Sequence, residues 1–122
     1  MWAAEAEKGH VEIRYGFVSS LPYPDCMFDL VTAFESYYFW PDLIKDLKEI
    51  MRVIKPGGSL LMANEAYTHE KFEKRNSRWA ELADMALHTP EEYRDFFAEA
   101  GYTNVEINVV PEKNWIAAVA EK

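Results

Sequence analysis

The residue types that most often carry chemistry are few and scattered in this sequence. The three histidines, His10, His69 and His88, lie far apart and match no metal-ligand spacing, so we predict no structural zinc. Cys26 is the only cysteine, and its place beside the apolar pair Met27–Phe28 favours a small packing residue over a nucleophile. The glycines form no Gly-x-Gly motif, and these residues contain no phosphate-binding loop of the kind that an unrelated nucleotide-binding α/β protein would need.

The composition indicates how many domains to expect, which kinds of partner the protein binds and in which compartment it lies. The sequence has 122 residues, of which 49% are hydrophobic, and this predicts a single globular domain over residues 1–122. The formal net charge is -8; nucleic acids and anionic membranes both attract clustered Lys and Arg, so we expect neither as a partner. With one cysteine and an acidic start that lacks the apolar run of a signal peptide, we expect a cytoplasmic protein.

The hydrophobic pattern predicts strands that alternate with helices. The expected elements are a helix end at 3–9, strands at 11–17 and 28–34, helices at 41–54, around 79–86 and at 89–101, and strands at 59–63, 104–110 and 115–122. The strand at 28–34 is nearly all apolar, which is typical of a strand buried on both faces. This order predicts an α/β domain with a mainly parallel sheet and an antiparallel hairpin at its C-terminal edge.

The strongest local signals mark the ends of helices. Thr89 and Glu92 have the spacing of a capping box. After the helix at 41–54, Pro56 prevents continuation, and Gly57–Gly58 can take the positive φ values that reverse the chain. We interpret residues 55–58 as a turn that builds the fold.

These elements, in this order and spacing, resemble a known family. LPYPDCMFDLVTAFESYYFWPDLIKDLKEIMRVIKPGGSLLMANE, residues 21–65, is similar to the central segment of class I S-adenosylmethionine-dependent methyltransferases that act on small molecules. TPEEYRDFFAEAGYTNVEI, residues 89–107, resembles the penultimate helix and strand of that family. The resemblance runs from about residue 4 to the C-terminus. It implies the C-terminal part of a Rossmann-like methyltransferase fold that lacks the first two strands.

The resemblance also implies S-adenosylmethionine as cofactor. Residues 16–18 match the family's Gly-Asp-Ala segment, in which the aspartate meets the adenine amino group. Phe17 cannot accept that hydrogen bond, so it could stack on the purine or belong to the core, while the amide of Val18 could still bind a ring nitrogen. Residues 34–36 match positions that line the methionine end. The implied cofactor-binding residues are Gly16, Phe17, Val18, Phe34, Glu35 and Ser36.

Other parts of the family's site find no match in these residues. The family has a glycine-rich loop and an acidic residue that binds the ribose hydroxyls, and neither matches a position here. The resemblance therefore implies that this chain alone binds the cofactor weakly and does not turn over. The candidate bases near the expected mouth of the site are Glu35, Glu65 and His69, although residues of these types are more often ordinary surface residues. The aromatic residues 37–40 could form the wall of an acceptor pocket or pack in the core.

A second hypothesis is a non-catalytic interaction module, or one half of a split protein. The family sheet places two strands between those expected here at 11–17 and 28–34. Their absence from this chain leaves a gap on the order of 10–15 Å at ordinary sheet spacing and exposes an apolar strand edge. We expect self-association, strand exchange in a dimer, or a partner chain to cover that edge.

Overall fold

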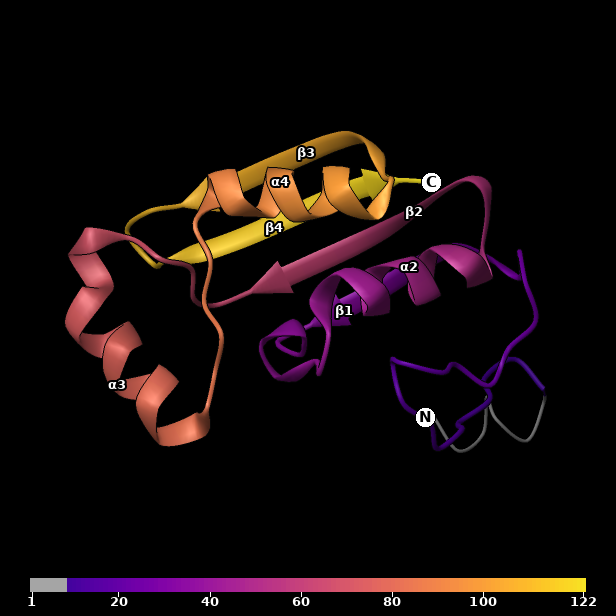
Figure 1. The fold of residues 1–122 in the computed structure, drawn as a ribbon, viewed down its shortest axis with the longest axis horizontal. Coiled ribbons are helices and arrows are strands. Elements are labelled where there is room, and N and C mark those ends of the chain that lie inside the picture. Colours follow the sequence, from indigo (N-terminus) through magenta and orange to yellow (C-terminus); the bar gives the residue numbers. More distant parts are fainter. Residues whose placement is uncertain (1–8) are drawn as a thin grey trace.

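The computed structural model describes residues 9–122 and confirms the alternation of strands and helices (Figure 1). The helix end expected at 3–9 lies, apart from Gly9, outside the described residues. Within residues 9–122, no helix combines the length and apolar character needed to cross a membrane. The elements are β1 (Phe28–Phe34), the 3₁₀ helix η1 (Tyr37–Phe39), α2 (Leu43–Val53), β2 (Ile54–Asn64), the 3₁₀ helix η2 (Glu70–Phe72), α3 (Glu73–Ala83), α4 (Pro90–Ala100), β3 (Thr103–Val110) and β4 (Trp115–Glu121).

Four strands form one sheet in the order β1-β2-β4-β3. β1 and β2 run parallel, whereas β4 pairs antiparallel with both β2 and β3. The α/β class and the C-terminal antiparallel hairpin are therefore confirmed. The described sheet is mixed rather than mainly parallel, because the second strand of the hairpin inserts beside β2 and runs against it.

The strand predicted at 11–17 is not present. A strand needs a neighbour for its backbone hydrogen bonds, and no described strand lies beside this segment; its one bridge joins Phe17 to Ser20 within a turn. The alternating side chains remain in solvent, with Ile13 82% and Tyr15 88% exposed. The alternation of apolar residues here does not lead to a strand, because the described chain supplies no partner for one.

The expectation that β1 is buried on both faces is also wrong. In the described sheet β1 is an edge strand, paired with β2 on one side only. Successive side chains of a strand point to opposite faces, and Ala33 lies in the core while Leu30 and Phe34 are 54% and 59% exposed. A continuous apolar run identifies the strand, but its burial depends on neighbours that the run does not specify.

Helices α2 and α4 cover one face of the sheet and enclose the core (Figure 1). Leu47 and Ile50 of α2 and Tyr93 and Phe97 of α4 are buried, together with alternate residues of β2 and β4. The capping box at the start of α4 is formed as predicted. No helix within residues 9–122 packs on the opposite face, which we call the open face.

Helix α3 is the predicted helix near 79–86, displaced toward the N-terminus and separate from the core (Figure 1). Trp79 and Leu82 are exposed, and the buried side chain of the helix is Asn76. The Asn76 amide donates to the carbonyl oxygen of Tyr67 at 2.8 Å and to Oδ1 of Asn114 at 2.9 Å. Hydrogen bonds rather than an apolar stripe therefore attach this helix to the fold.

The chain passes from α2 to β2 without an intervening loop, and two glycines make this possible. Gly57 has a φ of +83° with open space around it. At Gly58 a Cβ would lie 2.7 Å from the carbonyl oxygen of Asp29 in β1 and 2.7 Å from Cγ2 of Ile54. The absence of a side chain at Gly58 thus allows β2 to approach β1 closely. Residues 55–58, expected as a turn, instead form the start of β2, and of the two glycines Gly57 alone has a positive φ.

Carboxylates of α2 hold the segment of residues 16–25, which contains turns but no helix or strand. The hydroxyl of Ser19 donates to Oδ1 of the fully buried Asp46 at 2.8 Å. The backbone N–H of Leu21 donates to Oε2 of Glu49 at 2.7 Å. These contacts replace the regular backbone pairing that the segment lacks.

Arg52 of α2 completes this attachment. Its guanidinium donates to the carbonyl oxygens of Leu21 at 3.2 Å and Tyr23 at 3.0 Å, and to the carboxylate of Asp25 at 2.8 Å. It also makes paired hydrogen bonds of 2.8 and 2.9 Å to Glu49, which lower the pKa of the Glu49 carboxyl. A planar guanidinium suits such a set of acceptors better than a lysine ammonium would.

Replacing Gly58 by alanine is expected to destabilise the protein. The added methyl group would meet the Asp29 carbonyl and Ile54 at 2.7 Å, and overpacking of this kind costs about 1–3 kcal/mol. Urea denaturation followed by circular dichroism measures the loss. Gly57→Asn is the control, because asparagine tolerates a positive φ. An unchanged free energy of unfolding in Gly58→Ala would contradict the close approach described above.

Replacing Arg52 by glutamine is expected to release residues 16–25 while leaving the sheet intact. Hydrogen–deuterium exchange of the backbone amides, read by mass spectrometry, should accelerate in this segment and stay unchanged in β2 and β4. Arg94→Gln is the matched control, because Arg94 donates to the Val105 carbonyl in β3, at the sheet edge opposite β1. Equal exchange in the wild type and in Arg52→Gln would show that other contacts hold the segment.

Candidate functional site

Two segments that are distant in the sequence meet beside the carboxyl end of β1. Residues 16–18 and Ser36 line two cavities of about 330 and 750 Å³; Phe34 lines the smaller one and Glu35 the larger. The structure thus brings together all six residues that the sequence analysis names as cofactor-binding. We call these two adjoining spaces the β1-end cavities.

The turn at residues 16–20 forms one wall of these cavities. The backbone N–H of Ser20 donates to the carbonyl of Phe17 at 3.1 Å. A Cβ at Gly16 would lie 3.0 Å from Cδ of Pro22, so the chain packs tightly there. The ring of Phe17 is 64% exposed, so of the two interpretations left open for this residue, packing in the core does not apply.

The aromatic residues 37–40 divide between the core and the cavities. Tyr37 and Tyr38 are buried, and burial raises the pKa of both hydroxyls, so both stay protonated near neutral pH. Phe39 and Trp40 line the larger β1-end cavity. Packing in the core therefore holds for Tyr37 and Tyr38, while Phe39 and Trp40 line a cavity.

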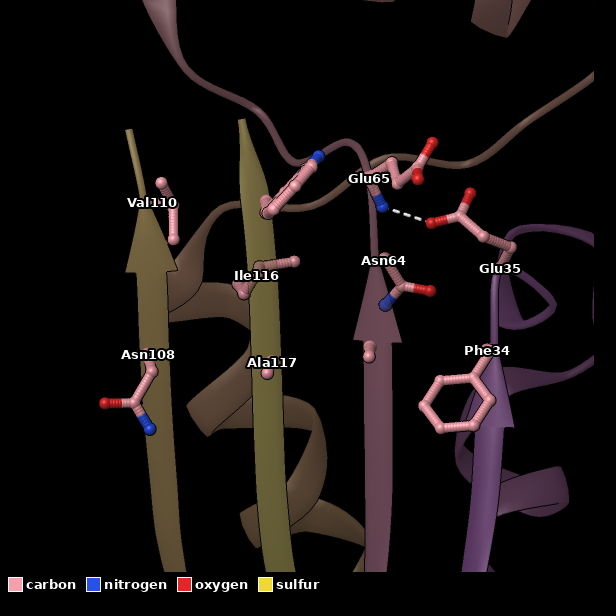
Figure 2. Close-up of a pocket in the computed structure, with 10 residues that line it drawn as sticks. Phe34, Glu35, Asn64, Glu65, Asn108, Val110, Ile116 and Ala117 are labelled. Atoms are coloured by element: carbon pink, nitrogen blue, oxygen red, sulfur yellow. Dashed lines mark hydrogen bonds between the residues drawn. The ribbon is translucent and has the colours of Figure 1, made fainter. Parts of the chain in front are cut away.

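Glu35 connects the carboxyl ends of β1 and β2. Its backbone has a φ of +54°, a left-handed conformation that costs energy in a residue with a side chain. Oε1 accepts a hydrogen bond from the backbone N–H of Glu65, as Figure 2 shows, and the Tyr38 hydroxyl lies 3.4 Å from the same oxygen. The one hydrogen of the Tyr38 hydroxyl has a nearer acceptor in the Ala66 carbonyl oxygen at 3.2 Å, so the Glu65 N–H is the donor that holds the carboxylate.

The other two candidate bases lie elsewhere. Glu65 follows β2 and lines a cavity on the open face that Glu35 also lines. His69 lines a cavity of about 430 Å³ beside α3, and its Nδ1 accepts from the N–H of Lys71 at 3.1 Å. Of the three candidates, Glu35 is the one that lines a β1-end cavity. Across residues 9–122 no group of three or more His, Cys, Asp or Glu side chains is arranged to hold a metal ion.

The cavity on the open face, with a volume of about 400 Å³, is a feature that the sequence did not reveal (Figure 2). All four strands or their ends contribute to it, so no single stretch of sequence marks it. Asn64 reaches the lining at the end of β2, but its side chain points to the helix-covered face, where its amide donates to the Tyr93 hydroxyl at 3.0 Å. The lining residues are Phe34, Glu35, Ala63, Asn64, Glu65, Asn108, Val110, Trp115, Ile116 and Ala117.

Comparison with known proteins identifies relatives that are longer than this chain. Residues 1–62 match the family described as "Methyltransferase domain". Demethylmenaquinone methyltransferase of Anoxybacillus flavithermus is 30% identical over 120 residues, covering 80% of this chain and 51% of that protein. The chloroplastic 2-methyl-6-phytyl-1,4-hydroquinone methyltransferase 2 of Oryza sativa subsp. japonica is 35% identical over 117 residues, covering 94% of this chain and 31% of that protein.

A solved structure shares the fold. A SAM-dependent methyltransferase from Thermotoga maritima, described as a possible histamine N-methyltransferase, matches with a TM-score of 0.75 at 21% identity, over 98% of this chain and 68% of that one. This confirms a partial Rossmann-like methyltransferase fold. The chain spans about half or less of the length of the two curated relatives. With a family match that covers half of its residues, this chain belongs to the methyltransferase domain family.

Proposed function

We propose that this chain supplies part of the site of an S-adenosylmethionine-dependent methyltransferase that acts on a small molecule. The observation that carries the proposal is the meeting of residues 16–18 and 34–36 around the β1-end cavities. Family membership supports the reaction. The names of the two relatives mention quinone-type rings, which supports a small aromatic acceptor. The single cysteine of the sequence supports a cytoplasmic site of action.

The residues that line the larger β1-end cavity fit the cofactor in size and in chemistry. Small-molecule sites usually enclose roughly 300–1,000 Å³, and this cavity has about 750 Å³. Phe17, Phe39 and Trp40 offer apolar and aromatic surface for the adenine ring. The carboxylate of Glu35 suits a ligand that carries a positive sulfonium. When bound, S-adenosylmethionine supplies the electrophilic methyl group and a neutral thioether leaving group.

The part played by this chain is to bind and orient. The backbone of residues 17–18, fixed by the turn and by α2, holds the adenine side. Glu35 and Ser36 hold the side nearer the methyl group, and the aromatic residues 39–40 exclude water. No Gly-x-Gly segment occurs in these residues, so we expect weak cofactor binding and no turnover by residues 1–122 alone.

A second function, self-association, is favoured by the edge of β1. The edge carries no partner within the described residues, and Leu30 and Phe34 expose apolar surface beside it. Unpaired edges of this kind pair readily with another strand. We infer a homodimer, or exchange of a strand between copies, as the alternative or additional role.

S-adenosylhomocysteine, added to isotope-labelled protein at high concentration, is expected to shift the backbone amide NMR signals of residues 16–18 and 34–36. Ser36→Trp should abolish these shifts because the indole fills the cavity. Ser77→Trp, at the cavity beside α3, is the matched control and should leave them unchanged. Shifts confined to the surroundings of Ser77 would contradict the proposed site. Micromolar binding of S-adenosylmethionine in titration calorimetry would overturn the expectation of weak binding.

Leu30→Lys is expected to shift the protein from dimer toward monomer, because a charge beside the β1 edge opposes pairing. Light scattering coupled to size-exclusion chromatography measures the mass over a range of concentrations. Leu82→Lys, a change at an exposed leucine of α3, is the control and should not alter the mass. A wild-type protein that remains a monomer at high concentration would refute self-association.

A further inference from the structure

We propose that helix α3 docks on the surface of an anionic lipid bilayer through one of its sides, which we call the basic face. This inference is independent of the proposed methyl transfer. The residues of the basic face recur at spacings of three and four, so they lie along one side of α3 and of η2, the turn that leads into it. They are Lys71, Lys74, Arg75, Arg78, Trp79 and Leu82.

Positive and negative charges are segregated around this helix. At about 100° per residue, the side opposite the basic face is the one that lines the cavity beside α3, with Glu70, Glu73, Asn76, Ser77 and Ala80. The acidic residues at the start of the helix thus lie on the cavity side. The six positions of the basic face hold four cations and no acidic residue. Charge complementarity therefore favours an anionic partner for the basic face.

Three of the four cations are available to such a partner. Lys71, Lys74 and Arg78 are exposed, and none of them forms an ion pair with another residue in the range 9–122. Glu81 flanks the basic face without pairing with it. The net charge of -8 led to the expectation that no anionic membrane is a partner. In physiological salt, however, the field of a charge falls off within about 8–10 Å, so a local cluster of cations can outweigh distant carboxylates.

The apolar side chains of the basic face favour lipid over nucleic acid. Leu82 is 75% and Trp79 39% exposed, and helices that lie in the membrane interface combine such residues with Lys and Arg. Arg75 stacks on the rings of Phe72 and Trp79, 4.4 and 4.3 Å from their centroids. One face of each ring is therefore covered, which leaves less aromatic surface for the stacking of nucleobases. An aliphatic side chain such as Leu82 suits acyl chains.

The attachment of α3 leaves its basic face accessible. Figure 1 shows the helix set apart from the sheet and from α2 and α4. Asn76 and Arg75 fix it by hydrogen bonds to Oδ1 of the buried Asn114, at 2.9 and 3.0 Å. A second copy of this chain is a poor occupant, because a two-fold contact would bring two basic faces together. A bilayer with anionic head groups is the partner that fits both the charges and the exposed apolar side chains.

Sedimentation with lipid vesicles tests the proposal. The 122-residue protein should pellet with vesicles of phosphatidylcholine that contain phosphatidylserine, and should stay in solution with vesicles of phosphatidylcholine alone. Binding should weaken as salt is added, because ions screen the attraction. The double variant Lys74→Gln/Arg78→Gln should bind about thirtyfold more weakly, as expected for the loss of two cations near an anionic surface.

Lys45→Gln/Lys48→Gln is the matched control, because it removes the same charge from two exposed lysines of α2 and should bind like the wild type. Leu82→Gln should lower the binding that persists at high salt, which reports on apolar contact. Equal binding by the two double variants, or no binding of the wild type to the phosphatidylserine vesicles, would overturn the proposal. Wild-type binding to a single-stranded oligonucleotide but not to vesicles, lost in Lys74→Gln/Arg78→Gln, would overturn it in favour of nucleic acid.

Discussion

Three charged side chains of α2 fix the segment on which half of the candidate cofactor site depends. Asp46, Glu49 and Arg52 are spaced three residues apart and therefore lie along one side of the helix. Together they make hydrogen bonds to residues 19–25, which have no regular structure of their own. These hydrogen bonds act together with the packing of Val18 and Leu21 against the core to keep residues 16–18 beside the end of β1.

The parallel pairing of β1 and β2 supplies the other half of the site. In parallel pairs the carboxyl ends of the strands lie at one edge of the sheet, which is where α/β proteins bind ligands. Here the ends are joined by the hydrogen bond from the Glu65 N–H to Glu35. The left-handed backbone of Glu35 directs its carboxylate toward β2 instead of continuing the strand. The cost of that conformation is offset by contacts that hold the side chain at the meeting point of the cavities.

Helix ends and strand identities could be predicted from the sequence because their causes are local. The Thr89 capping box acts within a few residues and is found in the structure. The glycines at 57–58 also act locally, although they lie at the start of β2 rather than in a turn. The strand expected at 11–17 failed because pairing depends on a distant neighbour. The burial of β1 was mispredicted for the same reason.

The candidate site likewise contains features that the sequence predicted and features that depend on contacts between distant segments. Residues 16–18 and 34–36 were found through a resemblance that extends over most of the chain, and the structure places them together. The open-face cavity escaped notice because its lining comes from four strands whose register no local pattern encodes. Arg52 was visible only as a polar residue of a helix, since its acceptors are backbone groups in another segment.

Arg52 and Glu49 bind backbone groups of residues 21 and 23. These hydrogen bonds therefore do not depend on which side chains the two residues carry. Substitution of residues 21 and 23 would therefore leave these backbone hydrogen bonds available, with proline at 21 as the exception, since it lacks the N–H that Glu49 accepts. The same tolerance would let descendants of this gene diverge in the surface of this segment while retaining its path. Selection could then change what the segment recognises without rebuilding the helix that holds it.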